Sequence, residues 1–188
     1  MSLVELIAQA DERGLAASGL ACLDRCVPLL GGDDEVLRPL WASLSDAGDA
    51  ADWGELLEQV RGKLAGAEEY AGSPEDEAAL LARRMLAAAP VDPSAAEVRI
   101  WADACSVAAL QIHRLLDPLE DEQASVDARR EGRTEGMSPL VAAELRRQVT
   151  VLEVLAGHGA AGLRRALEVS VEGRRVLRAV VSRRARLR

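Results

Sequence analysis

The sequence contains no phenylalanine, one tyrosine, three tryptophans and a single lysine in 188 residues. Aromatic residues, which favour strands, make up 2% of the chain, whereas 49% of it is hydrophobic, mostly Ala, Leu and Val. Because Ala and Leu are strong helix formers, the composition predicts an all-α protein. We interpret the use of Arg in place of Lys as the codon bias of a GC-rich bacterial genome, without functional meaning.

Long apolar runs are also missing. Stretches without an ionisable residue, such as residues 14–23, reach 10 residues, and a membrane-spanning helix needs about 20 apolar ones. Residues 1–5 contain no basic leader, so they do not have the pattern of a secretory signal. The 3 cysteines have no framework spacing, which favours reduced thiols. We therefore expect a cytoplasmic protein that does not bind membranes.

Amphipathic segments of helical period fill most of the chain. Ser2 with Glu5 has the pattern of a capping box, and Ser73-Pro74 is a typical helix start. Residues 118–138 differ, because they hold many charges and few apolar side chains. We therefore expect a helical-hairpin domain over 1–117, a flexible charged linker over 118–138, and a C-terminal helical segment over 139–188 that packs on the first part. This organisation predicts about seven to eight helices in antiparallel hairpins or a bundle.

Residues 167–181 allow two interpretations. Their apolar positions suit a helix, but they also alternate with period two around Gly173. We favour the helix, since residues 160–166 are helical in pattern and an isolated hairpin is marginally stable. A short β-hairpin at 167–181 remains the alternative.

A weak repeat relates the first four predicted helices. A shift of 34 residues places Gly14 on Gly48 and Leu23 on Leu57, with 7 identities in 25 positions. The segment 10–27, with Gly14 at the turn between helices, resembles a degenerate tetratricopeptide repeat. The resemblance covers residues 3–66 at most and implies two antiparallel hairpins. The aromatics and closing proline of that family are missing here, and plain helical hairpins are the alternative.

A glycine motif near the C-terminus is the sharpest match to known chemistry. Gly157, Gly159 and Gly162 stand between an apolar run and a helical run, which resembles a dinucleotide-binding fingerprint and the first motif of Rossmann-like methyltransferases. Only 26 residues follow Gly162, and nothing earlier has the pattern of the strands that such a sheet needs. A glycine turn between two helices is therefore favoured, and no cofactor is predicted.

The cysteines and histidines do not form a recognisable metal site. Cys22 and Cys26 are four residues apart on one helix, but no second pair of metal-binding spacing accompanies them. We interpret them, with Cys105, as small buried hydrophobes. His113 lies at the edge of an apolar face, as expected for a hydrogen-bonded residue at the core, and His158 has no evident partner. With no catalytic motif present, we predict no catalytic or metal-binding residue and lean against an enzyme.

The net charge of −8 is unevenly distributed. Residues 160–188 contain 9 Arg and 2 Glu, a net charge of +7, so residues 1–159 carry −15. Such a cluster could bind an anionic partner, including nucleic-acid phosphates. Two of these arginines, at 174 and 184, project towards the apolar side of the helix and could pair internally. The candidate residues are Arg174, Arg175, Arg178, Arg183, Arg184, Arg186 and Arg188.

Three functions remain open. The favoured one is a helical protein–protein interaction module without catalytic activity, whose partner is another protein or a second copy of the chain. The second is a nucleic-acid-associated protein that uses the Arg-rich end. The third is a small-molecule-binding helical bundle, which requires a buried cavity with convergent polar groups.

Overall fold

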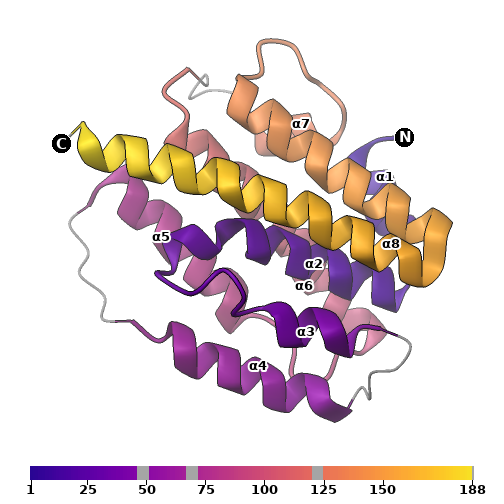
Figure 1. The fold of residues 1–188 in the computed structure, drawn as a ribbon. Coiled ribbons are helices and arrows are strands. Elements are labelled where there is room, and N and C mark those ends of the chain that lie inside the picture. The colour runs from indigo at the N-terminus through magenta and orange to yellow at the C-terminus, as the bar shows by residue number, and fades with distance from the viewer. Residues whose placement is uncertain (46–50, 67–71, 120–124, 188) are drawn as a thin grey trace.

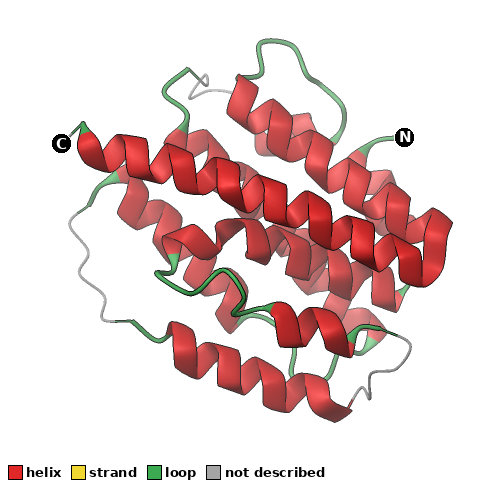
Figure 2. Ribbon diagram, viewed as in Figure 1, coloured by secondary structure: helices red, strands yellow, loops and turns green. Residues whose placement is uncertain are grey.

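The computed structural model of the chain describes residues 1–45, 51–66, 72–119 and 125–187. Within these ranges it contains eight α-helices, one 3₁₀ helix and no strand (Figure 1, Figure 2), which confirms the all-α prediction and slightly exceeds the expected number of helices. The elements are α1 (Leu3–Gln9), α2 (Glu12–Cys26), η1 (Val27–Leu29), α3 (Arg38–Ser43), α4 (Ala51–Leu64), α5 (Pro74–Ala87), α6 (Ala95–Leu116), α7 (Val126–Arg130) and α8 (Pro139–Arg186).

Helix α2 is the centre of the bundle. It packs against α8 and α6 along its length (Figure 1), and every residue from Gly14 to Cys26 is buried. Small residues in this helix allow its neighbours to come close. A β-carbon at Gly19, for example, would lie 2.7 Å from Cζ3 of Trp101. A helix enclosed on all sides needs this composition rather than a single apolar stripe.

Two tryptophans supply much of the bulk that phenylalanine would otherwise provide. The rings of Trp53 and Trp101 meet edge to face, with centroids 6.3 Å apart. Each indole N–H donates to a backbone carbonyl, that of Trp53 to Pro90 and that of Trp101 to Met85, both at 2.9 Å. Buried indoles require such partners, so these bonds tie α4, α5 and α6 together.

Helix α8 is a hairpin of two arms. Gly159 interrupts the helix with φ 51° and ψ −127°, a conformation that side chains other than glycine strongly disfavour. The N-terminal arm (139–158) and the C-terminal arm (160–186) run side by side in opposite directions (Figure 1). A β-carbon at Gly162 would lie 2.3 Å from the carbonyl oxygen of Val154. The glycine motif at 157–162 is therefore a turn between helices, as favoured from the sequence.

The β-hairpin considered for 167–181 is wrong, because these residues form part of the C-terminal arm. Ser170, Arg174 and Leu177 are buried at the spacing of a helical face. The alternating apolar residues Leu167, Val169 and Val171 are only partly buried, so the alternation does not mark the face that packs. Although α8 is long, no helix in the described ranges has the length and apolarity needed to cross a membrane.

Helix α7 falls within 118–138, the range expected to be a linker. Its residues Arg129 and Arg130 are buried, and Arg130 pairs with Asp103 and donates to the Ser106 hydroxyl at 3.1 Å. This part of the range is therefore attached to α6. Residues 120–124 of the expected linker lie outside the described residues.

The turn expected at Gly14 lies earlier. Helix α1 ends at Gln9, and the side chain of Asp11 accepts from the Gly14 amide at 2.7 Å, which caps α2. Gly48, the corresponding residue of the repeat, lies outside the described residues. Helices α2 and α4 also have different surroundings, since α2 is enclosed by α6 and α8 whereas α4 packs against α3 at the edge of the molecule (Figure 1).

Candidate functional site

An apolar groove of about 670 Å³ lies where the end of α6 meets both arms of α8. Its walls come from residues 116–119, from the first two turns of the N-terminal arm and from one face of residues 176–187. Leu119 and Leu187 line it and are 75% and 80% exposed. Large apolar side chains gathered at an open surface are typical of a binding site. We call this feature the α6–α8 groove.

Most polar groups at the groove are already occupied. The two carboxylate oxygens of Asp117 accept from the backbone amides of Leu119, at 3.0 Å, and Leu140, at 3.1 Å. Arg184 pairs with Glu75 and donates to the carbonyl of Leu116 at 3.3 Å. These bonds fix the walls of the groove to α5 and α6. Among the residues that the structure describes, no convergent set of polar groups is left inside the groove.

Three of the seven candidate arginines hold the C-terminal arm to the rest of the fold. Arg174 pairs with Asp24, Arg178 with Asp34, and Arg184 with Glu75. The inward direction expected for the first and the third is confirmed. Their positive charges are therefore largely neutralised within the chain.

Three other candidates, Arg175, Arg183 and Arg186, are exposed on the same arm. Among the described residues none of them has a hydrogen bond or ion pair. At about 100° per residue they fall on one edge of the helix, next to the stripe of Val176, Val180 and Leu187 that lines the groove. We call these three residues the arginine edge. The seventh candidate, Arg188, lies outside the described residues.

A buried ion pair joins α2 to the N-terminal arm. Arg25 donates from Nε to Oε2 of Glu144 at 2.8 Å and from Nη2 to Oε1 at 2.7 Å, and both side chains are fully buried. A bidentate pair of this kind is the strongest form of arginine–carboxylate contact. Burial raises the pKa of Glu144, but Arg25, His113 and the hydrogen bond from Gln148 together outweigh that effect, and the pKa falls to about 2. Glu144 is therefore ionised within the core.

The pair extends into a polar network across α6. Gln148 donates to Glu144 at 2.9 Å and accepts from the Ser106 hydroxyl at 2.7 Å. His113 is fully buried, with Nδ1 2.7 Å from the carbonyl of Ala109 and Nε2 3.6 Å from Oε2 of Glu144. Burial lowers the pKa of His113, although Glu144 acts in the opposite direction. The network thus holds a neutral histidine against an ionised carboxylate.

We predict that acid weakens the fold through this network. The unfolded chain binds a proton at His113 near pH 6.5, whereas burial lowers the folded-state pKa. The contribution of His113 to the free energy of unfolding is therefore complete above about pH 6.5 and decreases as the pH falls below this value. Glu144, with a pKa lowered from 4.5 to about 2, adds a further decrease below about pH 4.5. Urea unfolding at a series of pH values measures this, and His113→Leu serves as the control that flattens the first decrease. A free energy of unfolding that increases as the pH is lowered from 7 to 5 would contradict the prediction.

A second buried cluster lies on the other side of α2. Asp24 accepts from the indole N–H of Trp41 at 2.8 Å and pairs with Arg174. Burial raises the pKa of Asp24, while Arg174 and Trp41 act to lower it. Neighbouring residues of α2 therefore connect to opposite arms of α8, Asp24 to the C-terminal arm and Arg25 to the N-terminal arm.

The cysteines are buried and free. Burial raises the pKa of Cys22 to about 12 and raises those of Cys26 and Cys105 well above the usual value. Such thiols are poor nucleophiles, since the thiolate is the reactive form. Among the described residues no group of three or more His, Cys, Asp or Glu side chains is placed to hold a metal ion.

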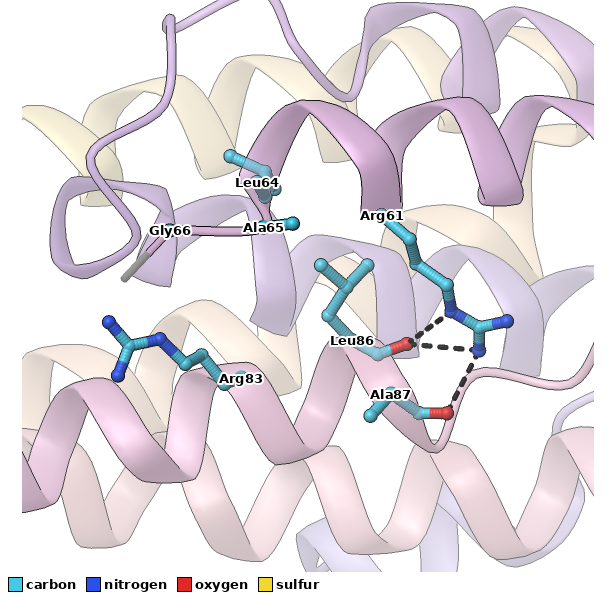
Figure 3. A pocket seen from close by; sticks show the side chains of 7 residues that line it. All are labelled: Arg61, Leu64, Ala65, Gly66, Arg83, Leu86 and Ala87. Atoms are coloured by element: carbon cyan, nitrogen blue, oxygen red, sulfur yellow. Dashed lines mark hydrogen bonds between the residues drawn. The ribbon is translucent and has the colours of Figure 1, made fainter. Parts of the chain in front are cut away.

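A smaller cavity of about 290 Å³ lies between the end of α4 and α5 (Figure 3). On one side Arg61 turns towards backbone carbonyls and donates to Leu86 at 3.2 Å and Ala87 at 2.9 Å. Arg83 extends from α5 on the side near Gly66. Arg61 therefore caps the C-terminal end of α5, where carbonyls lack helical partners.

Sequence reasoning did not find the groove or the Arg25–Glu144 network. A signal for the network exists, because Glu144 and Gln148 are four residues apart beside the apolar stripe of the N-terminal arm. The groove has a weaker signal in Val176, Val180 and Leu187, which form a second apolar stripe on an arginine-rich helix.

No known family model matches the chain, and neither the curated proteins nor the solved structures contain a match to it.

Proposed function

We propose that this chain is a helical protein-interaction module that receives an amphipathic helix of another protein in the α6–α8 groove. The observation that carries the proposal is the groove itself, with apolar walls from three helical segments and exposed leucines at 119 and 187. Helix-in-groove recognition needs an apolar surface of this kind and no catalytic group.

The polar groups of the groove favour a protein segment over a small molecule. A small-molecule site fixes its ligand through a few convergent polar groups. Here Asp117 bonds to two backbone amides, and Arg184 bonds to Glu75 and to a carbonyl. The remaining lining is mainly aliphatic, which suits the repeated leucine or isoleucine side chains of a helix.

Binding of a defined helical peptide tests the proposal. The probe is a labelled 16-residue peptide with leucines at helical spacing and glutamines elsewhere, and fluorescence anisotropy reports its binding. We expect the double variant Leu119→Asp/Leu187→Asp to bind about tenfold more weakly than the natural chain, because carboxylates would face the apolar helix. Both side chains are exposed, so the fold is expected to persist.

The control is Ile100→Asp. Ile100 is 73% exposed on α6 but does not line the groove, so binding should be unchanged. Equal affinity for all three proteins, or no binding by the natural chain, would contradict the proposal. Analytical sedimentation of the chain without peptide tests whether the groove instead binds a second copy of the chain. A dimer that becomes monomeric in the double variant would replace the foreign partner with a second copy of the chain.

A further inference from the structure

The arginine edge and the groove belong to one surface of the C-terminal arm. Arg183 itself lines the groove, and Arg186 is three residues further along the same helix. Both are exposed, with no ion pair or hydrogen bond among the described residues. An occupant of the groove would therefore lie beside positive charge along one of its flanks.

The nearby carboxylates that the structure describes are not paired with this edge. Asp117 is held by two backbone amides, and Glu172 lies 3.5 Å from Arg147. Glu75 is paired with Arg184. The described part of the groove thus has unpaired arginines along one flank, on a chain whose net charge is −8.

From this charge arrangement we infer that the groove selects an acidic amphipathic helix, whose apolar face enters the groove and whose carboxylates pair with the arginine edge. The inference rests on the proposed function and adds the chemistry of the partner. Arg suits this role, because its planar guanidinium binds carboxylates in a bidentate manner. Charges at the rim of an interface set partner choice and association rate.

A protein helix fits these features better than nucleic acid. Nucleic-acid binding surfaces that accept single strands combine positive charge with aromatic side chains for base stacking, and none of the described residues that line the groove is aromatic. Residues 1–159 carry a net charge of −15, which repels a long polyanion. The carboxylates of a short acidic helix in the groove would lie close to the arginine edge and far from most of the acidic chain.

Three peptides with one leucine pattern test the inference. Their other positions carry glutamate, glutamine or lysine, and the full chain is titrated with each at low and high salt. We expect the glutamate peptide to bind about tenfold more tightly than the lysine peptide at low salt, with the difference shrinking at high salt because exposed charges are screened. Arg183→Glu/Arg186→Glu should reverse the preference.

The matched control is Arg164→Glu/Arg165→Glu, which makes the same charge change at exposed positions near the hairpin turn. It should retain the preference for glutamate. If the glutamine peptide binds and the glutamate peptide has no advantage, the acidic partner is refuted while the interaction module stands. If no peptide binds, the module itself fails. Binding of a labelled oligonucleotide that is lost in Arg183→Glu/Arg186→Glu, with no preference among the peptides, would assign the edge to nucleic acid and overturn the inference.

Discussion

Replacing Glu144 with glutamine is expected to lower the free energy of unfolding by about 3–5 kcal/mol. Both carboxylate oxygens accept hydrogen bonds from Arg25, and neither side chain reaches solvent. A neutral amide would leave the guanidinium of Arg25 buried without its counter-charge, and an uncompensated charge in the core is costly. Equilibrium urea unfolding followed by circular dichroism measures the change.

Two further variants serve as controls for Glu144→Gln. Glu172→Gln removes a carboxylate that is 74% exposed beside Arg147, and it should change stability by no more than about 0.5 kcal/mol. The double variant Arg25→Met/Glu144→Met removes both buried charges and should recover most of the loss. If Glu144→Gln is as mild as Glu172→Gln, the pair does not stabilise the core as described.

Arg174→Ala is expected to lower the free energy of unfolding by about 3–5 kcal/mol as well, whereas Arg175→Ala should change it by about 0.5 kcal/mol or less. The two arginines are neighbours in the sequence, but Arg174 pairs with Asp24, whose side chain is 1% exposed, while Arg175 is exposed. Without Arg174 the carboxylate of Asp24 keeps, among the described residues, the indole of Trp41 as its hydrogen-bond donor.

The same unfolding assay compares the two alanine variants, and peptide binding is measured on both. Equal losses of stability would contradict the assignment of Arg174 to the core. Substitutions are also better probes of the Arg-rich end than a chain shortened to end at Glu172 would be. Such a truncation removes Arg174 together with the fully buried Leu177, so loss of binding could then follow from loss of the fold.

Features that depend on nearby residues were predictable from the sequence. The capping box at Ser2 is present, with its amide donating to Glu5 at 2.7 Å. Ser73 caps α5 in the same way, through Asp76. These signals need only a few residues and the geometry of one helix turn. The inward direction of Arg174 was predictable for the same reason, since the helical period alone decides which face a residue occupies.

Features that depend on distant residues were not predictable. Arg25 and Glu144 are 119 positions apart, and nothing in either local segment identifies the other as its partner. The groove likewise combines the end of α6 with both arms of α8. Its apolar residues each belong to an unremarkable helical pattern, and they meet only because Gly159 folds α8 back on itself. Each helix can thus be predicted from its own segment of sequence, whereas the groove and the buried ion pair depend on how distant helices pack together.

The ion pairs of the C-terminal arm have a consequence for how the protein folds during its synthesis. Asp24 and Arg174 are 150 positions apart, Asp34 and Arg178 are 144 apart, and Glu75 and Arg184 are 109 apart. On the ribosome all three acids are made long before the arginines that neutralise them. The nascent chain therefore carries a central helix whose carboxylate cannot yet be buried without cost. Contacts of such sequence separation also form slowly. The final step of folding is then expected to be closure of the hairpin over α2, after synthesis has passed residue 184.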